Sequence, residues 1–344
     1  MGNINLLISF LLPVYNVSNY IDDCIQSIVN QNVIGGYEIL CIDDCSTDGS
    51  YEVLKDISNR YKNVVISRND QNRGVSYTRN ELIKRARGKY IWFVDPDDLL
   101  YPNVVNLVID AANKVEADVL LGNYIRISET TTYLEAITYL FEPNKSLELQ
   151  KNEDLNILPK DTNGISMCAI WAGIFKRDFL ISNNIVFNEK MIAQEDTLFY
   201  YEFGLQTNQI FHFKESAYIY RQRSDSVMHS HNAKRALQYY YSMKEMYRVY
   251  MKYYTSALSL NRNQLEEKLE HMRQNLALTL VGVNDTSFVR EELQTLKKQK
   301  IYPYQTNFLQ KKRFGKILDY LLKRQWGFWI LHLIAKMKLL FSNV

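Results

Sequence analysis

The stretch Tyr90-Ile91-Trp92-Phe93-Val94-Asp95-Pro96-Asp97-Asp98 joins an apolar run to three carboxylates. The run is rich in aromatic and β-branched residues, which predicts a buried strand. Carboxylates crowded at the end of such a strand repel one another unless a cation lies between them. Mg²⁺ or Mn²⁺ with oxygen ligands usually brings a phosphate-bearing substrate. The same residues also fit a solvated acidic turn whose first Asp caps the next helix, so the surrounding sequence has to decide.

On both sides of this stretch, short apolar runs alternate with helical periods. The predicted strands are Leu6–Leu12, Tyr37–Ile42, Val64–Ser67, Tyr90–Val94 and Asp118–Leu121. The predicted helices are Ser18–Gln31, Ser50–Tyr61, Ser76–Arg87 and Pro102–Val115. Gly88 is expected to cap the third helix, and Pro102 to lie in the first turn of the fourth. This order predicts an α/β fold with a mainly parallel central sheet that is covered by helices on both faces.

Composition excludes several classes of protein. The chain has 344 residues, a 47% apolar fraction and a formal charge of +3, so we expect a globular protein without a nucleic-acid partner. Its cysteines (Cys24, Cys41, Cys45 and Cys168) form no CxxC pair, which disfavours a zinc site and fits a reduced, cytosolic protein. The apolar run 6–14 lacks the flanks of a signal peptide, and no run reaches the ~18–20 residues of a membrane span.

Polar motifs follow the predicted strands, at the edge of the sheet where ligands of such folds bind. In order they are Pro13-Val14-Tyr15-Asn16, Asp43-Asp44-Cys45-Ser46-Thr47-Asp48-Gly49-Ser50, Asn72-Arg73-Gly74, Arg79-Asn80 and Asp95-Pro96-Asp97-Asp98. Together they resemble the family 2 glycosyltransferases of the GT-A fold, which are inverting, metal-dependent enzymes that use nucleotide-activated sugars. The likeness is close through about residue 125 and looser to about residue 230; any one motif alone would be a weak signal.

The resemblance implies a nucleotide-sugar site. Asp44 is expected to accept from the N–H edge of uracil, Arg79 to contact the diphosphate, and Asp95 to contact the ribose or the sugar. The full expected set is Pro13, Tyr15, Asp43, Asp44, Asn72, Arg79, Asp95 and Asp97. Two structural alternatives stay open: Asp44 could cap a turn together with Ser46 and Asp48, and Arg79 could form a surface salt bridge.

The resemblance also implies a bound Mn²⁺ or Mg²⁺. Asp97 is expected to bind the metal directly, and Asp98 either to support it through water or to cap the following helix. The family has a flexible loop that closes over the diphosphate, and some relatives use a histidine there as a further metal ligand. The segment from Tyr220 to His229 resembles that loop, so His229 is a candidate metal ligand, with His231 as an alternative and a solvated histidine as the structural reading.

An inverting transfer needs a base that takes the proton from the acceptor hydroxyl. The run Gln194-Glu195-Asp196-Thr197-Leu198-Phe199 resembles the base motif of the family. Asp196 is the predicted catalytic base, with Glu195 as the second candidate; a helix N-terminus would by itself also favour an acidic pair. Trp171 lies in the segment that the family places near the acceptor, where it could stack on a sugar or be a buried core residue.

The chain is predicted to divide into a GT-A catalytic domain (1–230), a helical extension (231–310) and a basic amphipathic segment (311–344). The last segment carries eight Lys or Arg residues and one acid, Asp319, with Trp326, Phe328 and Trp329 among them. This pattern favours a helix on an anionic membrane, at the inner face of the plasma membrane. The alternative is a helix packed on the protein core or on a second subunit in a homo-oligomer.

The predicted function is transfer of a sugar from a nucleotide-sugar, expected to be a UDP-sugar, to a saccharide or lipid-linked acceptor in cell-surface polysaccharide biosynthesis. One alternative is a sugar-phosphate nucleotidyltransferase, although such enzymes open with a Gly-rich phosphate loop where this chain has Pro13–Val17. Another is a non-catalytic carbohydrate-binding protein on the same fold. A nicotinamide dehydrogenase is disfavoured because no GxGxxG follows the first predicted strand.

Overall fold

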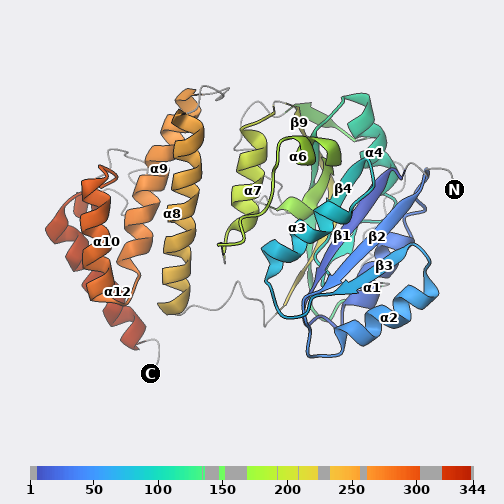
Figure 1. Ribbon diagram of the computed structural model, residues 1–344, viewed down its shortest axis with the longest axis horizontal. Helices are drawn as coiled ribbons and strands as arrows, with labels where there is room; N and C mark the ends of the chain where they lie inside the picture. The colour runs from blue at the N-terminus through green and yellow to red at the C-terminus, as the bar shows by residue number, and fades with distance from the viewer. Residues whose placement is uncertain are drawn as a thin grey trace. The chain divides into compact units, whose positions relative to one another are not determined.

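The structure is a computed structural model that describes residues 6–133, 135, 147–151, 169–191, 193–207, 209–223, 233–255, 262–302 and 320–341. The chain forms two compact units (Figure 1). The first comprises Met1–Glu189 with Asp196–Ser226, and the second comprises Lys190–Glu195 with Val227–Val344.

The first unit is built on one sheet, which has nine strands within the described residues. The first four strands along the chain are β1 (Ile8–Val14), β2 (Tyr37–Asp43), β3 (Val64–Arg68) and β4 (Tyr90–Phe93). They pair in parallel, with Ile8 aligned to both Tyr37 and Tyr90. The predicted α/β class and its parallel strands are confirmed, and the bounds of these four strands differ from the prediction by at most two residues.

Helices cover both faces of this sheet because the parallel strands are apolar on both sides. In β1, Phe10 and Leu12 face one core and Leu11 faces the other. The first core is closed by α1 (Ile21–Val29), α2 (Ser50–Arg60) and α4 (Val105–Lys114). The second is closed by α3 (Val75–Arg85), α6 (Arg177–Ser182) and α7 (Glu195–Gly204).

Two helix-end predictions are wrong. The helix α3 ends at Arg85, and its C-cap is Ala86 in an extended conformation, so Gly88 is not the cap. A Cβ on Gly88 would lie 2.5 Å from the backbone of Ile8 and Ser9, so the glycine permits close approach to β1. Pro102 lies in a turn that precedes α4 rather than in its first turn.

The second half of the sheet has both parallel and antiparallel pairs. Only one of its strands was predicted, Asp118–Leu121, and in the structure that strand continues to Ser128. Its strands are β5 (Leu99–Leu100), β6 (Val119–Ser128), β7 (Leu149–Lys151), β8 (Gly173–Lys176) and β9 (Ile210–Gln222). The order across the described sheet is β3-β2-β1-β4-β8-β6-β9-β5, with β7 paired to β9. The strand β8 lies antiparallel between β4 and β6, and β9 runs parallel to β6. A Cβ on Gly173 would meet the carbonyl oxygen of Leu120 at 2.0 Å, so β8 can lie beside β6 only with glycine at this position.

The second unit is helical in its described residues. It contains α8 (Ala233–Thr255), α9 (Arg262–Val281), α10 (Thr286–Lys298) and α12 (Gln325–Phe341). The helix α9 contacts both α8 and α12. The N–H of the imidazole Nδ1 of His332 donates to the carbonyl of Val281 at 2.9 Å, which ties α12 to the end of α9. None of the helices described has the length and apolarity that a membrane span requires.

Candidate active site

The parallel pairing of β1 with β2 and β4 brings their carboxyl ends to one edge of the sheet. The loops that leave β1 and β2 there are joined by hydrogen bonds. The N–H of Asn16 donates to Ser46 Oγ at 3.0 Å, and the N–H of Thr47 donates to Asn16 Oδ1 at 2.9 Å. Asp48 accepts from the N–H of Ser18 at 2.9 Å and from the N–H of Ser50 at 3.0 Å. These contacts hold two of the predicted ligand-binding loops together.

Asp44 lies at this edge and orders a third loop. Its Oδ1 accepts from Asn69 Nδ2 at 2.7 Å and from the N–H of Arg73 at 2.8 Å, and its Oδ2 accepts from the N–H of Gly74 at 2.8 Å. A carboxylate oxygen can accept two hydrogen bonds. Among the described residues only Gly74 donates to Oδ2, so Asp44 can hold its loop and still accept from a ligand.

The other residues predicted to contact the nucleotide occupy different environments. Asp43 is fully buried at the end of β2 and is paired with Arg68 Nε at 3.1 Å, so its carboxylate supports the loop rather than facing the rim. Pro13 lies within β1, where it pairs with Ile42, and Tyr15 is half-exposed just beyond that strand. Asn72 is exposed in the loop that Asp44 holds.

Arg79 joins two motifs that are far apart in the chain. Its buried guanidinium donates to Asp196 Oδ1 at 2.5 Å and to Asp95 Oδ1 at 3.0 Å. The ring of Phe187 lies 5.3 Å from the guanidinium carbon and covers it. Asp95 and the predicted base, Asp196, therefore share one cation, whereas Glu195 is the first residue of α7. Arg79 is thus not a surface salt bridge.

Asp97 lies beside a second arginine. Arg223 Nη1 is 3.2 Å from Asp97 Oδ2. Burial, and then the negative charge of Asp95, raise the pKa of the Asp97 carboxyl group, and Arg223 offsets part of this effect. A buried carboxylate next to another carboxylate is stabilised by added positive charge, which is the property expected of a cation site.

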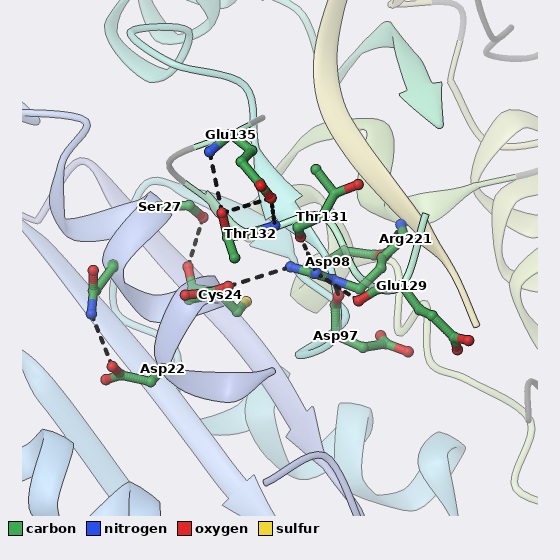
Figure 2. A network of polar contacts seen from close by, with 12 residues as sticks. Asp22, Cys24, Ser27, Asp97, Asp98, Glu129, Thr131, Thr132, Glu135 and Arg221 are labelled. Atoms are coloured by element: carbon green, nitrogen blue, oxygen red, sulfur yellow. Dashed lines mark hydrogen bonds and ion pairs between the residues drawn. The ribbon is translucent and has the colours of Figure 1, made fainter. Parts of the chain in front are cut away.

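Arg221 holds the turn that contains the acidic motif. Its N–H donates to Asp98 Oδ1 at 2.8 Å, and its Nε donates to the carbonyl of Asp97 at 2.9 Å. Its Nη1 donates to the carbonyls of Glu129 and Thr131, as Figure 2 shows. The resemblance had placed Tyr220 and Arg221 in a mobile closing loop, but both belong to β9, and that prediction is wrong. Arg221 and Arg223 are close together in the sequence, but Arg221 is 123 residues away from Asp98, so no local pattern linked these cations to the acidic motif.

The acidic motif fits a bound metal ion in part. No group of three or more His, Cys, Asp or Glu residues is arranged to hold a metal within the described part of the chain. Asp97 and Asp95 offer carboxylates at the rim and fit a cation whose other ligands come from a phosphate substrate. Asp98 is buried and accepts from the Arg221 N–H, so it fits the supporting role better than that of a direct ligand. The candidates His229 and His231 lie outside the described residues.

Trp171 is a core residue, so of the two alternatives left open by the sequence the structure favours burial over stacking on a sugar. Only 3% of its surface is exposed. Its ring stacks on Tyr218 and Tyr220, with centroids 4.4 Å and 5.6 Å away. Its carbonyl accepts from Trp92 Nε1 at 2.7 Å. The hydroxyl of Tyr218 in turn accepts from the N–H of Asp95 at 2.9 Å, so the aromatic stack holds the backbone of the acidic motif in place.

Comparison with known proteins gives a match to the family described as Glycosyl transferase family 2, over residues 9–179. The chain is 28% identical to "Uncharacterized glycosyltransferase EpsJ" of Bacillus subtilis, over 64% of this chain and 62% of that protein. It is 31% identical to "Poly(ribitol-phosphate) beta-glucosyltransferase" of Bacillus spizizenii, over 63% of this chain and 32% of that protein. The chain thus spans less than two thirds of the length of these relatives.

The fold is similar to that of S. aureus TarS 1-349 in its complex with UDP-GlcNAc. The TM-score is 0.57 at 20% sequence identity, and the superposition covers 92% of this chain and 79% of the TarS chain. At this identity the likeness concerns the fold alone. It includes most of the chain, beyond the segment that matches the family.

Proposed function

We propose that the protein is an inverting glycosyltransferase of cell-surface polysaccharide biosynthesis, since residues 9–179 match the family described as Glycosyl transferase family 2. It moves a sugar from a nucleotide-sugar, expected to be a UDP-sugar, to a saccharide or lipid-linked acceptor. The observation that carries this proposal is the Arg79 bridge between Asp95 and Asp196, because it joins a donor-side carboxylate to a candidate base. Neither a sugar-phosphate nucleotidyltransferase nor a non-catalytic carbohydrate-binding protein requires the Arg79 bridge. The family match also does not favour a nucleotidyltransferase.

In this mechanism Asp196 accepts the proton of the acceptor hydroxyl as that oxygen attacks the anomeric carbon. Arg79 holds the carboxylates of both Asp196 and Asp95 in fixed orientations. Asp95 contacts the sugar or the ribose of the donor. Asp44 and the loop it orders hold the base of the nucleotide through Oδ2. Asp97 and Asp95 would hold a Mn²⁺ or Mg²⁺ ion, which when bound neutralises the charge of the departing diphosphate.

The choice of a UDP-sugar draws support from the proteins compared above. TarS was solved with UDP-GlcNAc, and the B. spizizenii relative is named as a glucosyltransferase. The test is a panel of UDP-, GDP- and TDP-sugars with Mn²⁺, Mg²⁺ or EDTA, scored for release of the nucleoside diphosphate. We expect release from one UDP-sugar, and only with metal. Release from no donor, in a protein that binds UDP, would favour the non-catalytic alternative.

The protein is further proposed to act at the inner face of the plasma membrane through α12. Phe328 and His332 are buried on one side of this helix, while Trp326, Ile330 and Leu333 are exposed on another. The segment 311–344 carries eight basic residues and one acid, which complements anionic lipid. An amphipathic helix with basic flanks and an exposed tryptophan is typical of interfacial membrane binding.

A further inference from the structure

The side chain of Asn80 pairs with the backbone of a segment that leads to the predicted base. Asn80 follows Arg79 on α3 and is buried. Its Oδ1 accepts from the N–H of Phe187 at 2.8 Å, and its Nδ2 donates to the carbonyl of the same residue at 2.9 Å. A side-chain amide carries both an acceptor and donors, so it can satisfy the two backbone groups of one residue at once.

This pairing orders a part of the chain that regular secondary structure does not. The residues described between α6 and α7 form neither helix nor strand. Buried backbone groups that lack a partner are costly, and Asn80 provides a partner for both groups of the buried Phe187. The position of Phe187 is therefore fixed relative to α3, although the two residues are 107 positions apart in the sequence.

Phe187 in turn contacts both the arginine and the helix of the predicted ion pair. Its ring lies 5.3 Å from the guanidinium carbon of Arg79. It also stacks on Phe199 of α7, with the ring centroids 4.1 Å apart and the planes at 7°. Phe199 comes three residues after Asp196 on that helix, a spacing that puts both side chains on the same side. Asn80 is thus connected to the first turn of α7 through one aromatic ring.

We propose that Asn80 is a positioning residue for the catalytic base. Through Phe187 it fixes the first turn of α7, so that the carboxylate of Asp196 stays in contact with Arg79. Tyr200 and Phe203 hold the later turns of α7 in the core, so the Asn80 pairing acts mainly on the turn that carries the base. A displacement of about 1 Å at a catalytic group can cost about 10²-fold in rate. The inference rests on the proposed function, because it takes Asp196 as the base.

The experiment compares Asn80→Ala and Phe187→Leu with the wild type, each as the full chain. We expect kcat for transfer to fall about tenfold or more in both variants, because the base loses its fixed position. The donor KM and the UDP affinity should stay within about twofold, because the base acts on the acceptor. Exchange of the backbone amides that close the first turns of α7 should become faster. Phe187→Leu keeps an apolar side chain in the core and remains a test if Asn80→Ala does not fold.

Two controls separate positioning from stability. Thr207→Val removes a buried hydroxyl that donates to Asp118 Oδ2 at 2.6 Å, beyond the other end of α7. It should lower the thermal stability without changing kcat or the exchange of the first turns of α7. Glu189→Ala removes the second acceptor of Asn80 Nδ2, which lies at 3.0 Å, but leaves the pairing with Phe187. Its kcat should equal that of the wild type.

The inference is overturned if Asn80→Ala folds and keeps the wild-type kcat, or if Thr207→Val loses as much kcat for the same loss of stability. It is also overturned if the loss in Asn80→Ala is in donor affinity rather than in kcat. A wild type that binds UDP but transfers no sugar would refute the proposed function instead. In that case unchanged amide exchange in Asn80→Ala also overturns the positioning of α7, and faster exchange supports it.

Discussion

Arg79 Nη1 lies 2.5 Å from Asp196 Oδ1, across 117 residues of sequence. The same guanidinium reaches Asp95 Oδ1 at 3.0 Å, and only 4% of the arginine side chain is exposed. A planar guanidinium can serve two carboxylates in fixed directions, whereas an ammonium group acts as a point charge. The geometry of the proposed base therefore depends on this arginine.

Arg79→Lys should retain the charge but lose the simultaneous contact with Asp95 and Asp196. We expect kcat for transfer to fall at least about tenfold, which corresponds to about 1.4 kcal/mol, with a small change in thermal stability. Steady-state kinetics and thermal unfolding measure the two effects. Arg85→Lys is the control, since Arg85 is an exposed residue of the same helix. A wild-type kcat in Arg79→Lys would contradict the positioning role.

Asp196→Asn keeps the shape of the side chain but removes its ability to take a proton. Transfer should fall by about 10²–10⁴, the range typical of a lost general base, while donor affinity barely changes. Calorimetry with UDP and a transfer assay separate the two quantities. Glu195→Gln is the neighbouring control and should retain most of the activity. The opposite pattern, with Glu195→Gln inactive, would move the catalytic role to Glu195.

Asp97→Ala should make UDP binding insensitive to Mn²⁺ and leave the fold intact. Arg223→Gln should have the reverse effect and strengthen metal-dependent UDP binding, because Arg223 contacts the carboxylate that a cation would use. Titration of UDP with and without Mn²⁺ tests both variants, with Arg85→Gln as the exposed control. If wild type and Asp97→Ala bind UDP equally well under both conditions, Asp97 is not a metal ligand.

Asp48 should make the free energy of unfolding of the first unit decrease at acidic pH. Burial alone would raise the pKa of Asp48, but hydrogen bonds from Ser50 and Ser18 outweigh it and lower the pKa below the ordinary value of 3.8. Stabilisation by a carboxyl group with a lowered pKa is present above that ordinary value and is lost as the pH falls through the folded-state value.

Asp48→Asn should therefore reduce the free energy of unfolding at pH 7 by about 0.5–2 kcal/mol, the range for a lost capping contact. The difference from wild type should shrink as the pH falls below 3.8. Urea unfolding at pH 7, 5 and 3 measures it, and the exposed Asp56→Asn serves as the control. A difference that stays constant over this pH range would show that the Asp48 charge does not contribute.

The double variant Trp326→Ser, Leu333→Ser should release the protein from anionic liposomes. Both side chains are exposed on α12, so their removal should not unfold the helix. A deletion from Lys311 onward is a less selective test, because it also removes the buried Leu322 and Phe328. Flotation with and without anionic lipid is the measurement. If wild type does not float, the exposed face of α12 is not a membrane surface, and oligomeric state should then be measured.

Local patterns were sufficient for the parallel half of the sheet and for its loops. Each of those strands is an apolar run followed by turn residues, and its helix follows at once, so neighbouring residues determine the structure. The strand β8 was not predicted, because its position between β4 and β6 depends on contacts with residues far away in the chain. For Trp171 the sequence left burial and sugar stacking open, because its burial depends on contacts with Tyr218 and Tyr220, which are distant in the chain.

The sequence by itself determined the resemblance to the family 2 glycosyltransferases, the parallel α/β core and the set of acidic residues at its rim, because ordered motifs and strand periodicity are local properties. Only the tertiary structure decided which hydrogen-bond donor each carboxylate contacts. Arg79 joins Asp95 to Asp196, and the N–H of Arg221 reaches Asp98 across 123 residues. Such contacts require β9 and α7 to be placed beside the acidic turn, and that placement depends on strand order and core packing, which no short stretch of sequence encodes.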